Sequence, residues 1–242
     1  MTKTLTKKEK QVNLQVQQKK TKKEKPVEIF TNGNNAKIAD IVSIINLPPI
    51  ITCTNCATCA GSCYANFRYQ YPNVNKRWNR NWECTKADNF VEKATIELQY
   101  KGTPIVRFHE SGDFYSDDYI DKCFDLAVAN PNIFFYGYTK NKKALKLNAL
   151  SNVNIIYSLI ETPIGEVRNY GTQEYCEYLR DNFGVFICPH DNTWKNENKR
   201  CMTTCDKCKT LDKVCFIEHG RKAKKDPYPK ATLEKLKESK GN

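Results

Sequence analysis

The sequence predicts an α/β fold with a parallel sheet arranged as a partial β/α barrel. Three observations favour this class. Short apolar segments alternate with helix-like segments between about residue 87 and residue 188. The apolar segments lack a strict in–out alternation, which is typical of strands covered by helices. They are also too few for a complete eight-stranded barrel. A Cys-rich loop follows the first strands, and a second Cys-rich segment closes the chain.

The expected elements can be placed in chain order. Residues 27–30 and 38–45 are strand-like, and 50–52 read as a strand that leads directly into the first Cys group. Ser116 and Thr172 are suited to cap helices because their hydroxyls can accept from backbone N–H groups. The remaining expected strands are 103–109, 133–138, 153–159 and 184–188, and the expected helices are 87–98, 116–128, 141–150 and a segment after 172.

The chain divides into four expected parts by charge and composition. These are a basic tail (1–26), a body with the first Cys group (27–187), a Cys-rich metal-binding segment (188–220) and a second basic tail (221–242). Residues 1–25 hold nine Lys and two Glu, so much of the formal charge of +12 belongs to the ends. Such tails either contact nucleic acid weakly through its phosphates or are solvated, disordered arms.

Composition also bears on location. No apolar run reaches the roughly 18–20 residues of a membrane span, so no membrane partner is expected. The first 25 residues lack the apolar core of a secretory signal, which favours the cytoplasm. Because thiols stay reduced there, the twelve Cys point to metal or redox chemistry rather than to disulfides.

The first Cys group is Cys53, Cys56, Cys59 and Cys63, with the spacing C-x2-C-x2-C-x3-C. That spacing matches the run that holds a [4Fe-4S] cluster in bacterial ferredoxins. Zinc is the rival, but structural zinc generally uses two Cys pairs separated by a spacer. The sequence therefore predicts an iron–sulfur site on this loop.

The second Cys group is Cys201, Cys205 and Cys208, with Cys188 or Cys215 as a fourth ligand. The three-Cys spacing has a form used for [4Fe-4S] clusters, and a fourth thiolate would close the site. Zinc is again an alternative, because Cys-rich segments often need metal in order to fold.

Single Cys residues outside these groups are interpreted differently. Cys123 and Cys176 occupy helix positions and are expected in the core, while Cys84 stands alone.

A polar stretch follows the strand at 103–109. Arg107, His109 and Asp113 offer a cation, an imidazole and a carboxylate at the edge where chemistry collects in β/α folds. Arg107 and His109 are expected on one face because they lie two residues apart in a strand. Gly112 would allow a ligand to approach the backbone closely. The alternative is an ordinary strand end with a capping Asp and a hydrogen-bonded His.

Three further polar residues lie at the ends of the next two expected strands. Tyr138, Lys140 and Glu161 are placed where they suit the rim of a cofactor pocket.

Several segments resemble the phage gene-product-88-like domain family over roughly residues 32–221. They are GNNAKIAD, CATCAGSCYA, VRFHESGDFYSDDYID and NPNIFFYGYTKN, followed by CPH, CMTTCDKC and HGR. The resemblance implies a phage protein in the cytoplasm of an infected or lysogenic bacterial host. The family's C-x5-C-x3-CYA motif maps onto Cys53, Cys59 and Cys63, which makes Cys56 an addition. Three thiolates would leave one iron open, whereas four would close the cluster.

The layout is also similar to that of radical S-adenosylmethionine enzymes, in which a Cys loop follows the first barrel strand. The similarity implies that Ser111, Gly112 and Asp113 hold S-adenosylmethionine, while Arg107 and His109 face an unknown small-molecule or nucleotide substrate. The C-terminal Cys segment would carry an auxiliary [4Fe-4S] cluster. The alternative is a zinc-binding, nucleic-acid-associated phage protein without catalytic activity.

Overall fold

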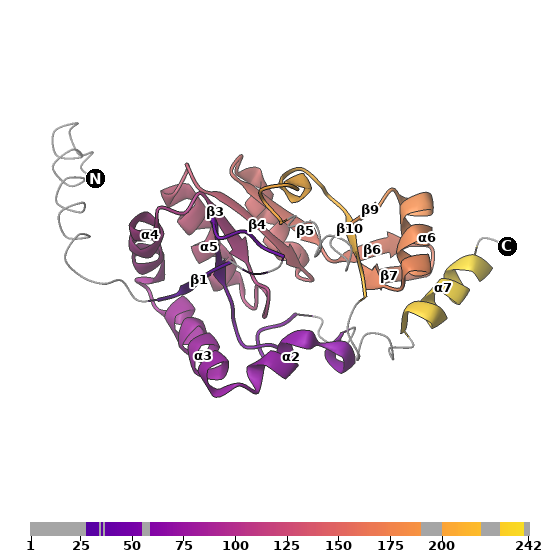
Figure 1. Ribbon diagram of the computed structural model, residues 1–242, viewed down its shortest axis with the longest axis horizontal. Coiled ribbons are helices and arrows are strands. Elements are labelled where there is room, and N and C mark those ends of the chain that lie inside the picture. The colour runs from indigo at the N-terminus through magenta and orange to yellow at the C-terminus, as the bar shows by residue number, and fades with distance from the viewer. Residues whose placement is uncertain are drawn as a thin grey trace.

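The computed structural model describes residues 28–33, 35, 37–54, 59–189, 200–218 and 228–239 (Figure 1). Its main sheet has the strand order β1-β2-β3-β4-β5, so neighbours in space are neighbours in the chain. β1 is antiparallel to β2, and β2 to β5 are parallel. This confirms a parallel-rich α/β sheet, and the sheet does not close into a barrel. The strands are β1 (Phe30–Asn32), β2 (Val42–Ile45), β3 (Ile105–Phe108), β4 (Phe134–Thr139) and β5 (Val153–Tyr157).

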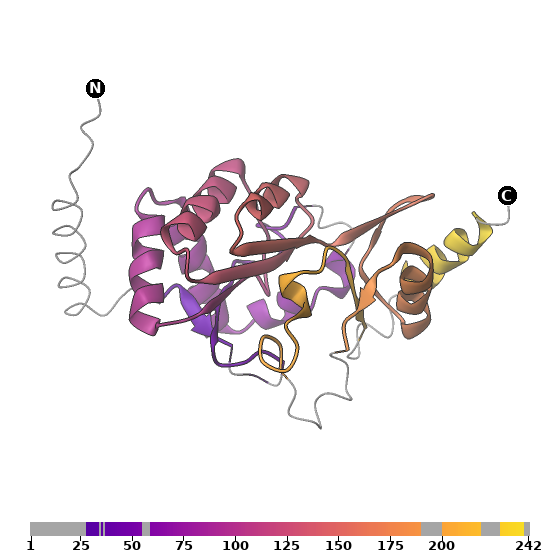
Figure 2. The same cartoon turned by 90° about the horizontal axis from the view of Figure 1, so that it is seen from above.

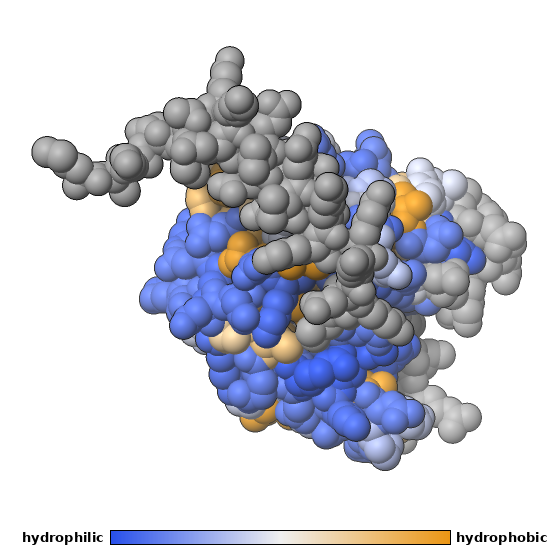
Figure 3. Space-filling view, turned by 90° about the vertical axis from the view of Figure 1, so that its left-hand side faces the viewer, coloured by the Kyte–Doolittle hydropathy of each residue, from blue (hydrophilic) through white to orange (hydrophobic). Residues whose placement is uncertain are grey.

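One face of the sheet packs against helices and forms the main core. Val106 and Phe108 of β3 point to this side, where they join buried residues of the covering helices. The helices expected over 87–98 and 116–128 are confirmed as α4 (Phe90–Lys101) and α5 (Asp117–Ala129), and Ser116 caps α5 by accepting from the Tyr119 N–H at 3.2 Å. The covering elements are α3 (Pro72–Lys86), α4 (Phe90–Lys101), α5 (Asp117–Ala129) and the 3-10 helix η3 (Lys142–Ala149). The solvent side of α3 and α4 is mostly hydrophilic (Figure 3).

The opposite face, here called the inner face, carries Ile44, Ile105 and Tyr136. The C-terminal Cys segment covers it, because Met202 lies in the same buried cluster and Cys208 packs against it. The side chain of Asn154 donates to the carbonyls of Cys208 and Leu211, both at 2.9 Å. The second Cys group therefore lies directly on the parallel sheet.

A second, smaller core lies at the other end of the molecule from α3 and α4 (Figures 1 and 2). Thr172 caps α6 as expected, with its hydroxyl 3.2 Å from the Tyr175 N–H. The elements here are the hairpin β6 (Leu159–Thr162) and β7 (Gly165–Arg168), the three strands β8 (Tyr170–Gly171), β9 (Phe186–Ile187) and β10 (Val214–Ile217), and the helices α6 (Gln173–Phe183) and α7 (Tyr228–Glu238).

Several expectations for local structure need correction. Residues 50–52 form a turn rather than a strand, and the segment 141–150 forms the 3-10 helix η3. Residues 228–238, expected within a basic tail, form α7, whose Leu233 and Leu236 are buried against α6. The tail 1–26 lies outside the described residues. No helix in the described part of the chain has the length and apolar character needed to cross a membrane.

Candidate functional site

The loops after β2 and β3 are tied together at the carboxyl edge of the sheet. The Asn46 side chain accepts from the N–H groups of Glu110 and Ser111 at 2.8 and 3.0 Å. Leu47 donates its N–H to the Ser111 carbonyl at 2.9 Å, and the Ser111 hydroxyl donates back to the Leu47 carbonyl at 2.8 Å. Ser111 was predicted to hold a cofactor, but its hydroxyl is engaged in fixing the start of the Cys loop.

Gly112 lies at the closest contact between the loop after β3 and the loop that leads to the first Cys group. Its φ is +83°, a conformation that favours glycine. A Cβ there would come within 2.6 Å of both the Leu47 Cβ and the Thr52 Oγ1. The next residue, Asp113, donates its N–H to the Thr52 carbonyl at 2.9 Å. The close approach predicted for a ligand is thus an approach of the chain's own loop.

The Asp113 carboxylate is buried and joins the β3 loop to the end of β4. It accepts from the Thr139 hydroxyl at 2.5 Å, the Lys140 N–H at 2.9 Å and the Phe114 N–H at 2.7 Å. Burial raises the pKa of Asp113, and these hydrogen bonds oppose that shift. Both carboxylate oxygens have protein partners, so its position is that of a structural clamp. Its role as a cofactor or catalytic group stays a prediction.

His109 does not share a face with Arg107, contrary to the expectation from strand spacing. β3 ends at Phe108, and His109 has a φ of +56°, which turns its side chain to the helix side. There its ring packs edge-on against Phe114, and its Nε2 lies 2.9 Å from the Tyr119 hydroxyl. Burial, aided by the Arg107 charge, lowers the pKa of His109 to about 3. The imidazole is a neutral core group.

Arg107 projects from β3 onto the inner face. Its guanidinium carbon lies 5.4 Å from the Tyr138 ring centre and 6.0 Å from that of Tyr136. The nearest carboxylate oxygen, on Glu110, is 3.8 Å from its Nη1. Burial opposes the positive charge, but the neighbouring Tyr136 and Glu110 outweigh it and raise the pKa of Arg107. Within the described structure, the Arg107 Nε and the Tyr136 hydroxyl are buried without a hydrogen-bond partner.

The second Cys group lies beside these donors. The Tyr138 hydroxyl donates to the Cys208 Sγ at 2.9 Å. Cys201 and Cys205 pair through a β-bridge, and Cys201 joins Cys208 at the edge of the inner-face cluster. Arg107 is close enough to lower the pKa values of Cys201 and Cys208. The structure therefore brings Arg107 and this Cys group together, which the sequence did not predict.

Burial disfavours the thiolate form of Cys201 and Cys208 in this group. Burial raises the pKa of Cys201 to about 11, and the neighbouring thiols of Cys208 and Cys205 add to the shift. Burial also raises the pKa of Cys208, partly offset by the hydrogen bond from Tyr138. Across the described ranges, no group of three or more His, Cys, Asp or Glu side chains is arranged so that it could hold a metal ion.

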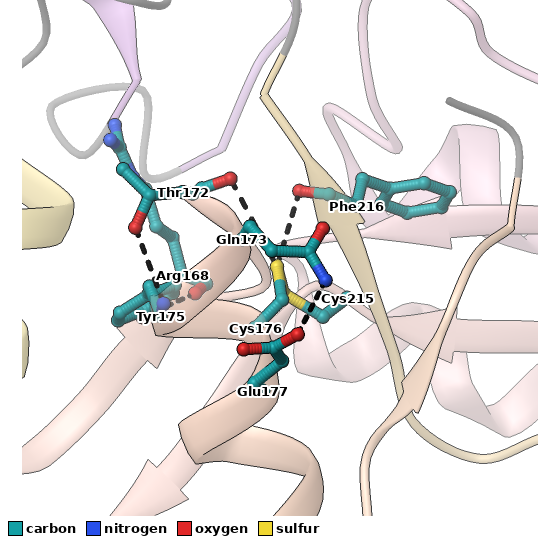
Figure 4. The surroundings of a disulfide bond; sticks show 9 residues. Arg168, Thr172, Gln173, Tyr175, Cys176, Glu177, Cys215 and Phe216 are labelled. Carbon is teal, nitrogen blue, oxygen red and sulfur yellow. Dashed lines mark hydrogen bonds between the residues drawn. A yellow bond between two sulfur atoms is a disulfide. The ribbon is translucent and has the colours of Figure 1, made fainter. Parts of the chain in front are cut away.

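The two candidates for a fourth ligand are placed differently. Cys215 of β10 forms a disulfide with Cys176 of α6 (Figure 4). This corrects the expectation that the chain lacks disulfides, and it occupies Cys215 in this state. Cys188 is half-buried and donates its N–H to the Cys215 carbonyl at 2.8 Å.

The first Cys group lies at the carboxyl edge of the sheet. Cys53, Cys59 and Cys63 are each half-buried, while Cys56 falls outside the described residues. The Lys140 Nζ, just beyond the end of β4, is 3.4 Å from the Cys59 Sγ. The loop after β2 thus returns to the end of β4, as expected for a loop that covers this edge.

The last predicted rim residue lies elsewhere. Glu161 is exposed on β6, and its Oε1 is 3.1 Å from the Lys142 Nζ. The structure therefore places Glu161 on the surface of the β6–β7 hairpin. By contrast, Tyr136 belongs to the site but was missed. The sequence pattern could have identified Tyr136, because it lies two residues from Tyr138 on β4 and so shares a face of the sheet with it.

Comparison with known proteins gives one assignment. The family model described as Gene product 88 matches residues 5–231. No curated protein and no solved structure matches the chain. Because the match covers most of the sequence, the chain belongs to the Gene product 88 family of phage gene products.

Proposed function

We propose that this protein is an iron–sulfur enzyme related in layout to radical S-adenosylmethionine enzymes. In this proposal Cys53, Cys59 and Cys63 hold a [4Fe-4S] cluster at the carboxyl edge of the sheet. One observation carries it. The loop with these thiols leaves β2, the first parallel strand, and its Cys59 reaches Lys140 at the end of β4. Functional groups collect at this edge in β/α folds.

The donor chemistry fits a thiolate-bound metal at both Cys groups. The Lys140 ammonium beside Cys59 and the Tyr138 hydroxyl that donates to Cys208 are partners suited to anionic sulfur. At the second group, the Tyr136 hydroxyl and the Arg107 Nε are further buried donors that need acceptors. Hydrogen bonds from neighbouring residues commonly tune metal-bound thiolates. In our proposal the thiols shift to converge when metal binds.

When bound, the first cluster would supply an electron for reductive cleavage of S-adenosylmethionine at an iron without a protein ligand. Gly112 and Asp113 hold the loop and β4 in place, and Arg107 offers its charge to an anionic part of the substrate. The second group, on Cys201 and Cys208 with Cys205, would carry the auxiliary cluster.

The test is an anaerobic assay for 5′-deoxyadenosine after reconstitution with iron and sulfide. Cys59→Ser should abolish product formation because it removes a proposed ligand. Cys84→Ser is the matched control, since Cys84 is also a free, partly exposed thiol but lies on α3. Cys56→Ala should retain activity if one iron is open. Absence of product in the wild-type protein with any reductant would contradict the enzyme proposal.

The zinc alternative predicts a different result in the same preparation. Zinc bound without sulfide, together with a cluster-free spectrum, would favour a structural metal protein. The positive charge of Arg107 would equally balance a zinc ion held by three thiolates. Metal analysis therefore decides between zinc and an iron–sulfur cluster.

A further inference from the structure

The segment around the first Cys group has an unusual charge pattern. Residues 41–82 contain four basic side chains and no acidic one. Helix α2 (Tyr64–Tyr69) and the start of α3 lie within this window. Of the basic residues, Arg68 and Lys76 are exposed, whereas Arg77 and Arg80 contact Glu28. A segment whose own charged side chains are all basic favours an anionic partner.

The same segment exposes three large aromatic rings. Tyr64, Phe67 and Tyr71 are 60%, 50% and 56% exposed, although their average burial in proteins is far higher. Tyr64 and Phe67 lie three residues apart on α2, and Tyr71, the residue before α3, packs its ring against Phe67. We call these three residues the aromatic ridge. On α2 only Ala65 is buried, so this helix contributes little to the core.

The ridge is held in place rather than collapsed onto the protein. The Tyr64 hydroxyl donates to the carbonyl of Glu110. Phe67 and Tyr71 pack edge to face, with ring centres 6.1 Å apart. Next to them, Tyr69 stacks on the buried Trp78, which anchors α2 to α3. These contacts hold the three residues in place while each of them stays exposed.

We propose that the aromatic ridge is a binding surface for single-stranded nucleic acid. Unpaired bases stack on exposed rings, and the phosphate backbone is attracted by nearby cations such as Arg68 and Lys76. An anionic membrane or an acidic protein would also complement the positive charge of Arg68 and Lys76. However, rings flanked by amide groups such as Asn66 and Gln70 match base stacking and base edges more closely. The surface adjoins the first Cys group, since Tyr64 directly follows Cys63, but base stacking on its rings requires no metal chemistry.

The test is a fluorescence anisotropy titration of the full chain with labelled oligothymidylate and oligouridylate of about 12 nucleotides. Phe67→Ala should weaken binding by about tenfold, because one stacked base is lost. Tyr71→Ala should act similarly. Tyr100→Ala is the matched control, since Tyr100 is 64% exposed but lies on α4, and its affinity should equal that of the wild-type protein.

Two further arms separate this surface from other sources of binding. Arg68→Ala should reduce the salt dependence, by about 0.7 in the slope of log affinity against log salt. Deleting residues 1–25 should leave the Phe67 effect intact, because the ridge lies outside that tail. Preference for the thymidine or the uridine oligomer tells DNA from RNA, and either supports the proposal.

Three results would overturn it. The first is equal affinity for the Phe67→Ala, Tyr71→Ala and Tyr100→Ala variants. The second is complete loss of binding on deletion of residues 1–25. The third is Phe67-dependent binding to polyglutamate or to anionic phospholipid vesicles that equals or exceeds binding to the oligonucleotides. The Phe67→Ala variant should fold normally because the Phe67 ring is exposed, and circular dichroism checks this.

Discussion

The buried imidazole of His109 should make the fold sensitive to acid. Burial lowers its pKa in the folded state to about 3, against an ordinary value of 6.5. Between these values the unfolded chain takes up a proton that the folded chain does not. The stability that depends on a neutral His109 is therefore fully present above about pH 6.5. It is lost progressively as the pH falls toward about 3. At about pH 4.5 the loss amounts to roughly 2 to 3 kcal/mol of the free energy of unfolding.

The assay is urea unfolding at about pH 7.5 and about pH 4.5, in the wild-type protein and in His109→Asn. Asn tolerates the positive φ at this position. Its carboxamide does not titrate, so the variant should lose about 2 to 3 kcal/mol less stability on acidification. Comparing differences removes the effect of all shared carboxylates and of the substitution itself.

Two results would refute this reasoning. One is an identical pH dependence in both proteins. The other is an NMR titration of the His109 ring with a pKa near 6.5, which would mean that the imidazole is solvated. It would then return as a candidate acid or base for catalysis, as first predicted from the sequence.

Two other predictions concern the Cys loop and the disulfide. Gly112→Ala would force a Cβ against Leu47 and Thr52, so metal content at the first Cys group should fall and stability should drop by about 1 to 3 kcal/mol. Full metal content with an unchanged unfolding midpoint would argue against this packing. Reduction of the Cys176–Cys215 bond, with a sequence separation of 39, should lower stability by up to about 4 kcal/mol. Thiol titration of the denatured, unreduced protein should find two fewer than twelve thiols, and twelve would contradict the pairing.

The parallel sheet and its covering helices could be predicted because apolar patterns dominate them. Val106 and Phe108 sit in a short apolar strand, and the capping hydroxyl of Ser116 marks the start of α5. Helices α2 and α3 were missed, since their sequences are rich in Asn, Arg and Tyr and bury few residues. Only Pro72, at the first position of α3, marked a helix start.

The site was harder to predict because sequence gives the polar groups but not their partners. Ser111 and Asp113 look like ligand-binding residues, yet their side chains bond to the chain's own loops. His109 reversed direction because the strand ended one residue earlier than its pattern indicated. Cys176 was expected in the core and is buried there, but its disulfide partner Cys215 is 39 residues away, in a segment expected to bind metal.

The central claim is that the two Cys groups bind iron–sulfur clusters, and the most direct measurement is iron and acid-labile sulfide per chain in protein purified without oxygen. The account predicts equal amounts of iron and sulfide, about four of each per cluster. Cys59→Ser should lose the iron and sulfide of the first cluster, and Cys208→Ser those of the second. Cys84→Ser should retain both. A colourless protein that lacks iron and sulfide, yet unfolds cooperatively, would contradict the account.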